Sequence, residues 1–303
     1  MRTKPWAAVA AAVPLAAGCV AGASAGPASA ASAPSSAPAR AAHSPRVPAG
    51  TTAAWLVFDR KAGKIVATRN AHRKFRSASV VKILIAIDYL ESGASVSPAD
   101  ARLLKIMLRS SDDDAASTFW DRRGKGAIIQ RMARKLGLSD TTPPPASKPG
   151  FWGYTSLSAY DIVRTYRYLL DTAAPKVRDT ILGHLRESTR CGTDGFDQSF
   201  GIPGALPRPW AVKQGWSGFG TVPPARCQAN SASGGAISAV AFRARGSGVP
   251  DYGRPVLHTT GLLGKGDRLI MAVLTAHPAG GTWSASVDRV TRLTRDLYRG
   301  LPS

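Results

Sequence analysis

The chain has 303 residues, with 40 Lys and Arg against 19 Asp and Glu, and a formal net charge of +21. Residues 1–50 contain four of these positive charges and no acid, so the remainder carries +17. A surface this basic attracts polyanions by forces that salt screens. Because the sequence has no nucleic-acid-binding motif and no interleaving of basic with aromatic residues, nucleic acid is not the expected partner. Anionic wall polymers or lipids remain possible partners. The alternative is that the composition is rich in arginine without any specific partner.

The first thirty residues have the three parts of a secretory signal. Arg2 and Lys4 precede an apolar run at 5–20, and residues 28–30 form an A-x-A cleavage pattern. We therefore predict that 1–30 is a signal peptide and that the mature protein is secreted. The apolar run is too short and alanine-rich for a membrane span, so we expect no transmembrane segment in the mature form. A disordered alanine-rich start is the alternative.

Cys19 offers a second route of export. Residues 15–19, LAAGC, resemble a bacterial lipobox, whose cysteine is lipidated after cleavage. Ala16 stands three residues before Cys19, where that pattern prefers leucine, so a lipoprotein is the minority hypothesis. Palmitate labelling that Cys19→Ala abolishes would support it.

The rest of the chain predicts one domain. Residues 31–50 are mostly alanine, proline and serine, which cannot bury a core, so we predict a linker before a domain at 51–303. Apolar periodicity and turn signals predict strands at 54–59, 64–68, 210–216, 256–262 and 269–275, helices at 79–90, 98–109, 115–121, 128–136, 157–170, 176–185 and 282–298, and a loop at 141–154. This order predicts an α/β (α+β) fold, in which an antiparallel sheet built from both chain ends carries an inserted all-helical lobe.

The helix that begins at Ser79 is apolar on nearly every side. Only Lys82 and Asp88 are charged between Val80 and Leu90, so this helix should be buried. Ser79 and Lys82 are three residues apart and share one helical face. Burial disfavours the charged form of a lysine, and a neutral amine beside a serine hydroxyl is a general base beside a nucleophile. A capping serine followed by a snorkelling lysine is the common alternative.

Two further motifs follow in order. Ser111-Asp112-Asp113 precedes a predicted helix, which Asp and Ser could simply cap, and residues 212–216, VKQGW, form a predicted strand. With the Ser-x-x-Lys at Ser79, these motifs resemble those of class A β-lactamases and the related penicillin-binding D-alanyl-D-alanine peptidases. The chain is most similar to exported β-lactamase-like serine hydrolases of actinobacteria.

The resemblance implies a set of catalytic roles. Ser79 would be the acylated nucleophile, Lys82 would take its proton, and Ser111 would relay a proton to the leaving nitrogen. Nucleophile, base, acid and anion pocket are the parts that an acyl transfer needs. The substrate would be a β-lactam or a peptidoglycan-type acyl-D-alanine peptide, handled by a monomer without cofactor or metal.

The resemblance also implies a substrate-binding set. Lys213 would attract the substrate carboxylate and tune the second serine, and Asp113 stands in place of the Asn that holds the substrate amide. Gln214 and Gly215 complete the third motif, and the backbone amide of Trp216 would share the oxyanion hole with that of the nucleophile.

Three departures from the family pattern affect this prediction. An ionised Asp113 only accepts hydrogen bonds and repels a carboxylate, unless it is protonated or pairs with Lys82. Gln214 replaces the usual Thr or Ser; it can still donate to a carboxylate, but its length shifts the contact. The loop glutamate that activates water in class A enzymes is missing, because neither glutamate of the chain lies between 113 and 156. Asp140, the only acid between Arg123 and Ser158, is expected to cap or turn residues 139–142. We therefore predict slow β-lactam turnover.

Other side chains leave alternatives open. Cys191 and Cys227 are an even pair in an exported protein, which suggests a disulfide, although two free thiols remain possible. No Cys-x-x-Cys occurs and the five histidines are scattered, so no metal site is expected. The aromatic side chains of Trp152, Tyr154 and Trp216 either line a cleft or pack.

Two other functions compete with the acyl-hydrolase. A wall-binding protein that kept the fold and lost efficient chemistry would explain the departures, since a fold does not guarantee an activity. A Ser-His-Asp esterase is disfavoured, because residues 215–219 fail the nucleophile-elbow pattern at Phe219. His258 and His277 lie in or beside predicted strands and are expected to be structural.

Overall fold

A computed structural model describes residues 44–228 and 253–302. The predicted signal peptide at 1–30, Cys19 and residues 31–43 of the predicted linker lie outside the described residues. Residues 44–50, the last part of that linker, already contact the domain: Val47 packs against the core, and the carbonyl of Gly50 accepts a hydrogen bond from Arg254 at 2.7 Å.

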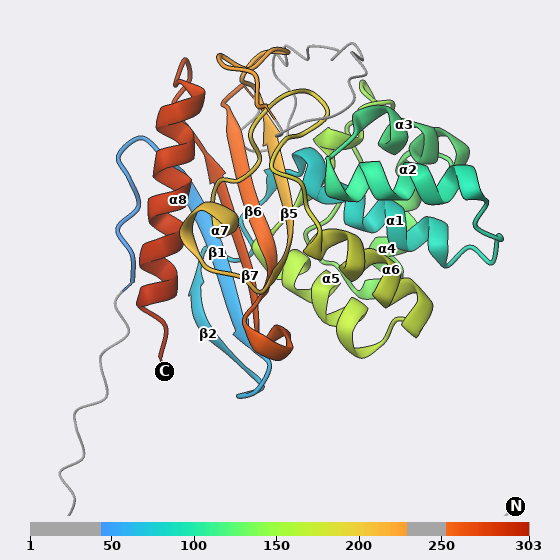
Figure 1. The fold of residues 1–303 in the computed structure, drawn as a ribbon, viewed down its shortest axis with the longest axis horizontal. Helices are drawn as coiled ribbons and strands as arrows, with labels where there is room; N and C mark the ends of the chain where they lie inside the picture. The colour runs from blue at the N-terminus through green and yellow to red at the C-terminus, as the bar shows by residue number, and fades with distance from the viewer. Residues whose placement is uncertain (1–43, 229–252, 303) are drawn as a thin grey trace, which may run out of the picture. The chain divides into compact units, whose positions relative to one another are not determined.

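The sheet combines the two ends of the domain, as predicted. Its strands are β1 (Thr52–Asp59), β2 (Lys64–Arg69), β5 (Trp210–Ser217), β6 (Val256–Leu263) and β7 (Leu269–Ala276). They are antiparallel, in the order β2-β1-β7-β6-β5. Pairing of β1 with β7 along their full length therefore joins segments more than 200 residues apart (Figure 1).

Side-chain alternation along the strands divides the core in two. On β1, Leu56 contributes to the larger cluster and Trp55 and Val57 to the smaller one, which Leu293 and Leu297 complete. Successive strand residues point to opposite faces, so both faces of the sheet are covered. Helix α8 (Trp283–Arg299) covers one face, and helices α1 to α6 lie on the other side (Figure 1).

The helical part is inserted between β2 and β5. It contains the 3-10 turn η1 (Ala78–Val81), α1 (Lys82–Leu90), α2 (Pro98–Arg109), α3 (Asp113–Arg122), α4 (Gly126–Leu136), the 3-10 turn η2 (Trp152–Tyr154), α5 (Ala159–Asp171) and α6 (Pro175–Arg186). Every residue of α1 from Lys82 to Tyr89 is buried, which confirms the predicted buried helix.

Side-chain caps fix several helix starts. Ser97, Asp112, Ser158 and Thr282 each accept a hydrogen bond from the backbone amide three residues ahead, which satisfies a donor that has no partner inside the helix. Gly137, at φ +64°, ends α4 in the left-handed conformation that favours glycine.

Short elements were not predicted. These are η2, α7 (Ile202–Ala205), the 3-10 turn η3 (Lys265–Asp267), and a small sheet of β3 (Phe75–Arg76) with β4 (Ser156–Leu157). The predicted helix at 79–90 begins as η1, and the one at 157–170 begins at Ala159. Two to four residues carry too little apolar periodicity to reveal an element. Within the described ranges, no helix is both long enough and apolar enough to span a bilayer.

Candidate active site

Ser79 and Lys82 meet at the start of the buried helix. Lys82 Nζ donates to Ser79 Oγ at 2.9 Å, and the lysine side chain is fully buried. Ser79 lies inside η1, and neither η1 nor α1 has a side-chain cap. The serine therefore does not cap the helix; its hydroxyl faces the lysine instead.

The amine of Lys82 contacts two residues of the second motif, Ser111 and Asp113. Nζ donates to the carbonyl of Ser111 at 2.6 Å and to Asp113 Oδ1 at 2.7 Å, and lies 3.3 Å from Ser111 Oγ. The Asp113 side chain is 63% exposed, so only one side of its carboxylate is held. Asp113 thus pairs with Lys82, one of the two states that the sequence left open.

Lys213 reaches the same serine from β5. Its Nζ donates to Ser111 Oγ at 2.8 Å and to the carbonyl of Gln214 at 3.2 Å. Burial, reinforced by the positive charge of Lys82, holds the pKa of Lys213 well below its usual range, and the carboxylates of Asp113 and Asp194 only partly oppose this. The four polar side chains from Ser79 to Lys213 therefore form one continuous hydrogen-bonded chain.

Backbone strain accompanies both serines. Ala78, just before Ser79, has φ +44°, and Ser111 has φ +59°. Non-glycine residues in this region cost roughly 1–3 kcal/mol each and cluster at functional sites. Both positions lie at or next to a serine that contacts Lys82.

Gly215 allows β5 to approach η1. A Cβ at this position would lie 3.0 Å from both the Ser77 carbonyl and Val80 Cγ2, closer than side chains normally pack. Glycine in the third motif is thus needed for contact between the strand and the turn that carries Ser79.

The expected role of the Gln214 side chain is contradicted. Gln214 is fully buried, and its Nε2 donates to the carbonyl of Phe200. Adjacent strand residues point to opposite faces of a sheet. Because Lys213 points toward Ser111, the amide of Gln214 points away from it and has no contact with the cleft.

Asp194 is a site residue that sequence analysis missed. Its Oδ2 accepts a hydrogen bond from Trp216 Nε1 at 2.9 Å and its Oδ1 one from the Phe196 amide at 3.1 Å. Burial raises the pKa of Asp194, as does the negative charge of Asp113, so the two acids lie in one electrostatic environment. An aspartate in a glycine-containing loop gives no signal of this in the sequence.

A disulfide holds this wall of the site. Cys191 and Cys227 are bonded in the structure, with their Cα atoms 5.5 Å apart. The amide of Cys227 donates to the carbonyl of Gly195 at 2.8 Å. The bond thereby ties the loop of Asp194 to the segment that follows β5.

Trp152 covers the amine of Lys82 from the loop side. The indole centroid lies 4.6 Å from Lys82 Nζ, and its Nε1 donates to Ser117 Oγ at 3.2 Å. Trp152 and Trp216 thus both belong to the site, whereas Tyr154 is buried and packs.

The predicted role of Asp140 belongs largely to another residue. Asp161, on α5, accepts hydrogen bonds from the amides of Ser139 and Asp140 and from Thr141 Oγ1, at 2.7 to 3.2 Å. Asp140 Oδ2 instead contacts Ser158 Oγ and His72 Nδ1, each at 2.8 Å. Both acids hold the loop in place through these hydrogen bonds, so the contacts of Asp140 are structural.

Comparisons with known proteins were made on both sequence and structure. No family model matches the chain. Two proteins named "Putative lipoprotein LppW", from Mycobacterium tuberculosis and Mycobacterium bovis, are 40% identical to it over 185 residues. The match covers 58% of this chain and 58% of each relative, so it spans less than two thirds of their length.

Solved structures share the fold at low identity. A mutant of PBP-A in an acyl-enzyme complex with penicillin G has a TM-score of 0.58 at 15% identity, covering 83% of this chain and 90% of that one. The β-lactamase of Streptomyces albus G has a TM-score of 0.58 at 19% identity, covering 83% and 94%. The class A β-lactamase of Mycobacterium abscessus has a TM-score of 0.56 at 17% identity, covering 82% and 94%. The predicted β-lactamase and transpeptidase-like fold is thereby confirmed.

Proposed function

We propose that this chain, which has the fold of class A β-lactamases and of PBP-A, is a serine acyl-hydrolase that forms an acyl-enzyme on Ser79. Its substrates would be β-lactams or peptidoglycan-type acyl-D-alanine peptides. The observation that carries the proposal is the hydrogen-bonded chain from Ser79 through Lys82 and Ser111 to Lys213. A nucleophile, a base and a proton relay in contact are what acyl transfer requires.

Acylation follows from this chain of contacts. Ser79 Oγ attacks the substrate carbonyl carbon and forms the C–O bond while Lys82 Nζ takes its proton. The C–N bond then breaks, and the leaving nitrogen takes a proton from Ser111 Oγ. Lys82 Nζ, 3.3 Å away, returns a proton to Ser111 Oγ. Lys213 polarises the Ser111 hydroxyl throughout. Amides of Ser79 and Trp216 would stabilise the oxyanion.

Deacylation is proposed to be slow. The loop between Asp113 and Ser156 has no glutamate, and the indole of Trp152 lies over Lys82 on the side of that loop. A bulky apolar ring leaves little room there for a water and supplies no base to activate it. The acyl-enzyme should therefore persist, as in a penicillin-binding protein.

A second candidate function is a wall-binding protein with impaired chemistry. The ion pair between Lys82 and Asp113 favours it, because a carboxylate at 2.7 Å holds the amine in a strong charge-assisted hydrogen bond and competes with Ser79 for it. The same pair could act as a resting state that substrate binding breaks. The two functions differ in whether Ser79 becomes acylated.

Export is part of the proposal. The signal features at 1–30 and the name "lipoprotein" of the mycobacterial relatives both support an extracytoplasmic location. Secretion and lipid attachment through Cys19 remain two forms of this hypothesis. Acyl-D-alanine peptides of the wall would then be within reach.

Intact-mass spectrometry after incubation with a penicillin tests the proposal. The wild type should gain the mass of one penicillin and keep it through a chase, and Ser79→Ala should gain none. Ser77→Ala, two residues earlier in the same turn, is the matched control and should still be acylated. No adduct on the wild type would select the binding protein, and an adduct that vanishes within seconds would select an efficient lactamase.

A further inference from the structure

Two adjoining hollows carry a high density of positive charge away from the four hydrogen-bonded site residues. The first, about 500 Å³, is lined by the turn between β1 and β2, by η3 and by the end of α5. The second, about 320 Å³, follows α5 and α4. Arg167 and Asp171 line both hollows, which therefore adjoin; the two together are called the basic groove below.

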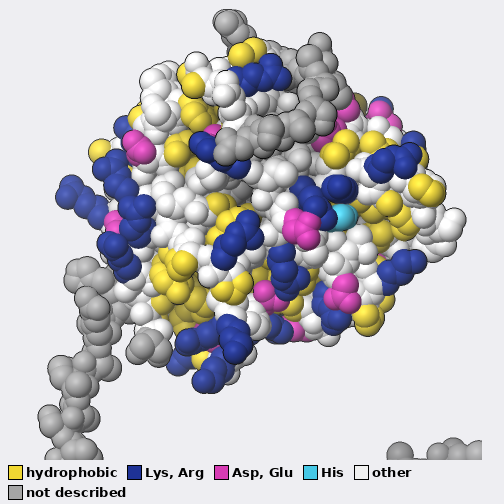
Figure 2. All heavy atoms as spheres, viewed as in Figure 1, with side chains coloured by type: hydrophobic (Ala, Val, Ile, Leu, Met, Phe, Trp, Pro, Cys, Tyr) yellow, Lys and Arg dark blue, Asp and Glu magenta, His cyan; other side chains and the backbone are white. Residues whose placement is uncertain are grey.

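The groove is lined by seven cations and one acid. The cations are Arg60, Lys61, Arg167, Lys265 and Arg268 in the first hollow, with Lys135 and Arg164 added in the second; the acid is Asp171. None of these residues belongs to the proposed catalytic chain. Figure 2 shows Lys and Arg side chains gathered along the lower edge of the face that it displays. A wall with one sign of charge concentrates counter-ions of the other sign.

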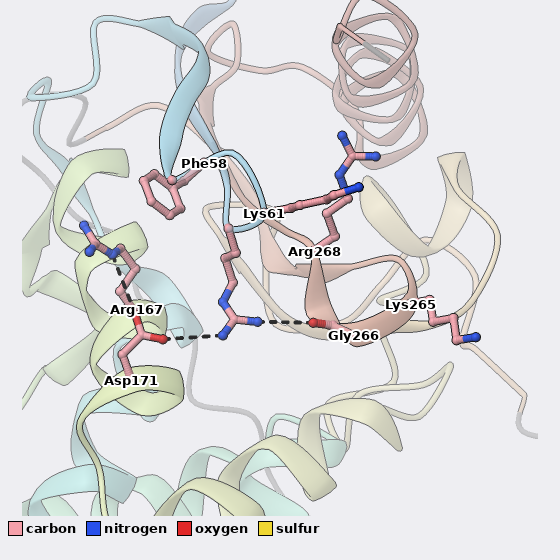
Figure 3. A pocket seen from close by; sticks show the side chains of 9 residues that line it. Phe58, Lys61, Arg167, Asp171, Lys265, Gly266 and Arg268 are labelled. Atoms are coloured by element: carbon pink, nitrogen blue, oxygen red, sulfur yellow. Dashed lines mark hydrogen bonds and ion pairs between the residues drawn. The ribbon is translucent and has the colours of Figure 1, made fainter.

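Internal contacts hold the arginines in place. Arg60 Nη2 lies 3.4 Å from Asp171, and its Nη1 donates to the Gly266 carbonyl at 3.1 Å, so this side chain bridges α5 and η3 (Figure 3). Arg268 donates to Asp59 Oδ2 through Nε and Nη2, and this bond holds the pKa of Asp59 below its usual range. The guanidinium of Arg167 lies 4.7 Å over the ring of Phe58. Each arginine is thus positioned before any ligand arrives, and its remaining N–H groups can still donate.

The three lysines differ from one another. Lys135 forms an ion pair with Glu91, whereas the amines of Lys61 and Lys265 have no ion-pair or hydrogen-bond partner among residues 44–228 and 253–302. In Figure 3 the Lys61 and Lys265 side chains extend away from Arg167 and Asp171. A flexible ammonium serves as a point charge for a phosphate, and a fixed guanidinium as a directional donor. The groove combines both.

We propose that the basic groove binds a phosphodiester polymer, such as a chain of glycerol phosphate units. A single phosphate would need only one of the two hollows, whereas cations spread over both, with a shared centre at Arg167, match an extended chain of repeated charges. The groove would hold the protein on an anionic polymer while the separate Ser79 site meets its own substrate.

Titration of a fluorescent poly(glycerol phosphate) tests the proposal, with anisotropy read at low and at moderate salt. The wild-type protein should bind, and Lys61→Glu with Lys265→Glu should weaken binding at least about tenfold and lower the salt slope by roughly 1 to 2. Arg102→Glu with Lys105→Glu, two exposed residues of α2 that line neither hollow, makes the same change in net charge. This control should weaken binding less than about threefold.

Several outcomes would overturn the proposal. Equal losses in the two double variants would mean that net charge alone drives binding, and inorganic phosphate competing as well as the polymer at equal phosphate would mean a single-anion site. Vesicles with phosphatidylglycerol that outcompete the polymer would point to a membrane surface instead. Lys61 and Lys265 make no side-chain bonds within the described part of the chain, so unchanged thermal unfolding of the groove variant should exclude misfolding as the cause. Absence of polymer binding by the wild type would also refute it.

Discussion

Asp113 Oδ1 lies 2.7 Å from Lys82 Nζ, in contact with the amine that also faces Ser79. The carboxylate occupies the place where the family pattern has an amide. A carboxylate at this distance makes a charge-assisted hydrogen bond, which is stronger than one to an amide, and it competes with Ser79 for the same amine. The ion pair is therefore the contact on which the rate of acylation should depend most directly.

Asp113→Asn should speed acylation. An amide keeps the shape and one acceptor oxygen, but its hydrogen bond with the Lys82 amine is weaker than that of a carboxylate. A bond to a charged group is worth about 1.5–3 kcal/mol and a neutral one about 0.5–1.5 kcal/mol, so the amine is freer to turn to Ser79 and we expect acylation by a penicillin to rise by roughly tenfold. Stopped-flow or quenched intact-mass measurements give the rate. Asp114→Asn, one residue along α3, should leave it unchanged, and a slower Asp113→Asn would mean that the carboxylate itself takes part in proton transfer.

Trp152→Glu should shorten the life of the acyl-enzyme. The indole lies 4.6 Å from Lys82 Nζ, so a shorter carboxylate there opens space for water and supplies a base. We expect faster deacylation by about tenfold or more, because a well-positioned general base contributes about 100- to 10,000-fold and a newly introduced one should supply at least part of this. Loss of the mass adduct during a chase reports the rate. Trp152→Phe keeps an apolar ring and serves as control; equal acceleration by both variants would show that space alone, not a base, limits the reaction.

The bond between Cys191 and Cys227 should stabilise the domain. It closes a loop with a sequence separation of 36, for which loop-closure entropy gives about 3–4 kcal/mol as an upper range. Cys191→Ser with Cys227→Ser should therefore lower the free energy of unfolding by up to about 3 kcal/mol. Urea denaturation of both proteins at equal pH measures this, and an unchanged midpoint would contradict it. The paired substitution avoids a lone thiol, which either single variant would leave.

His258 and His277 should make the fold sensitive to acid. Burial lowers the pKa of His258 to about 4 and that of His277 to about 3. The unfolded chain, where histidine titrates near 6.5, binds protons that the native state excludes. The free energy of unfolding is therefore highest, as far as these histidines are concerned, above about pH 7. It falls as the pH is lowered toward 4, by up to about 1.4 kcal/mol per pH unit for each histidine.

Urea unfolding at several pH values between 7 and 4.5 measures this loss. The informative quantity is the slope of the unfolding free energy against pH, because His258→Asn also removes the hydrogen bond of Nε2 with the Arg76 carbonyl at 2.8 Å. The variant should have a shallower slope than the wild type, whatever its absolute stability. Equal slopes would mean that His258 is protonated in the native state.

The sequence by itself determined the long elements and which side chains are candidates for the site. Helix α2 and the five sheet strands follow from apolar periodicity with errors of two residues or fewer at each end. Ser79 and Lys82 were proposed from their spacing of three residues on one helical face, and Ser111 and Lys213 from the resemblance to the β-lactamase and penicillin-binding motifs. The partners of Gln214 and Asp161 could not be found this way, because no pattern within a few residues specifies them.

Only the tertiary structure decided which groups meet. Asp194 reaches Trp216 through a loop held by a disulfide, and Trp152 covers Lys82 because η2 packs against η1. The basic groove likewise joins turns and helices far apart in sequence. Local propensity sets where a strand or helix forms, but contacts across the fold depend on the packing of all elements at once. That is why the proposed role of Ser79 could be inferred from the sequence, whereas the contacts of Asp194 and Trp152 and the grouping of the cations could not.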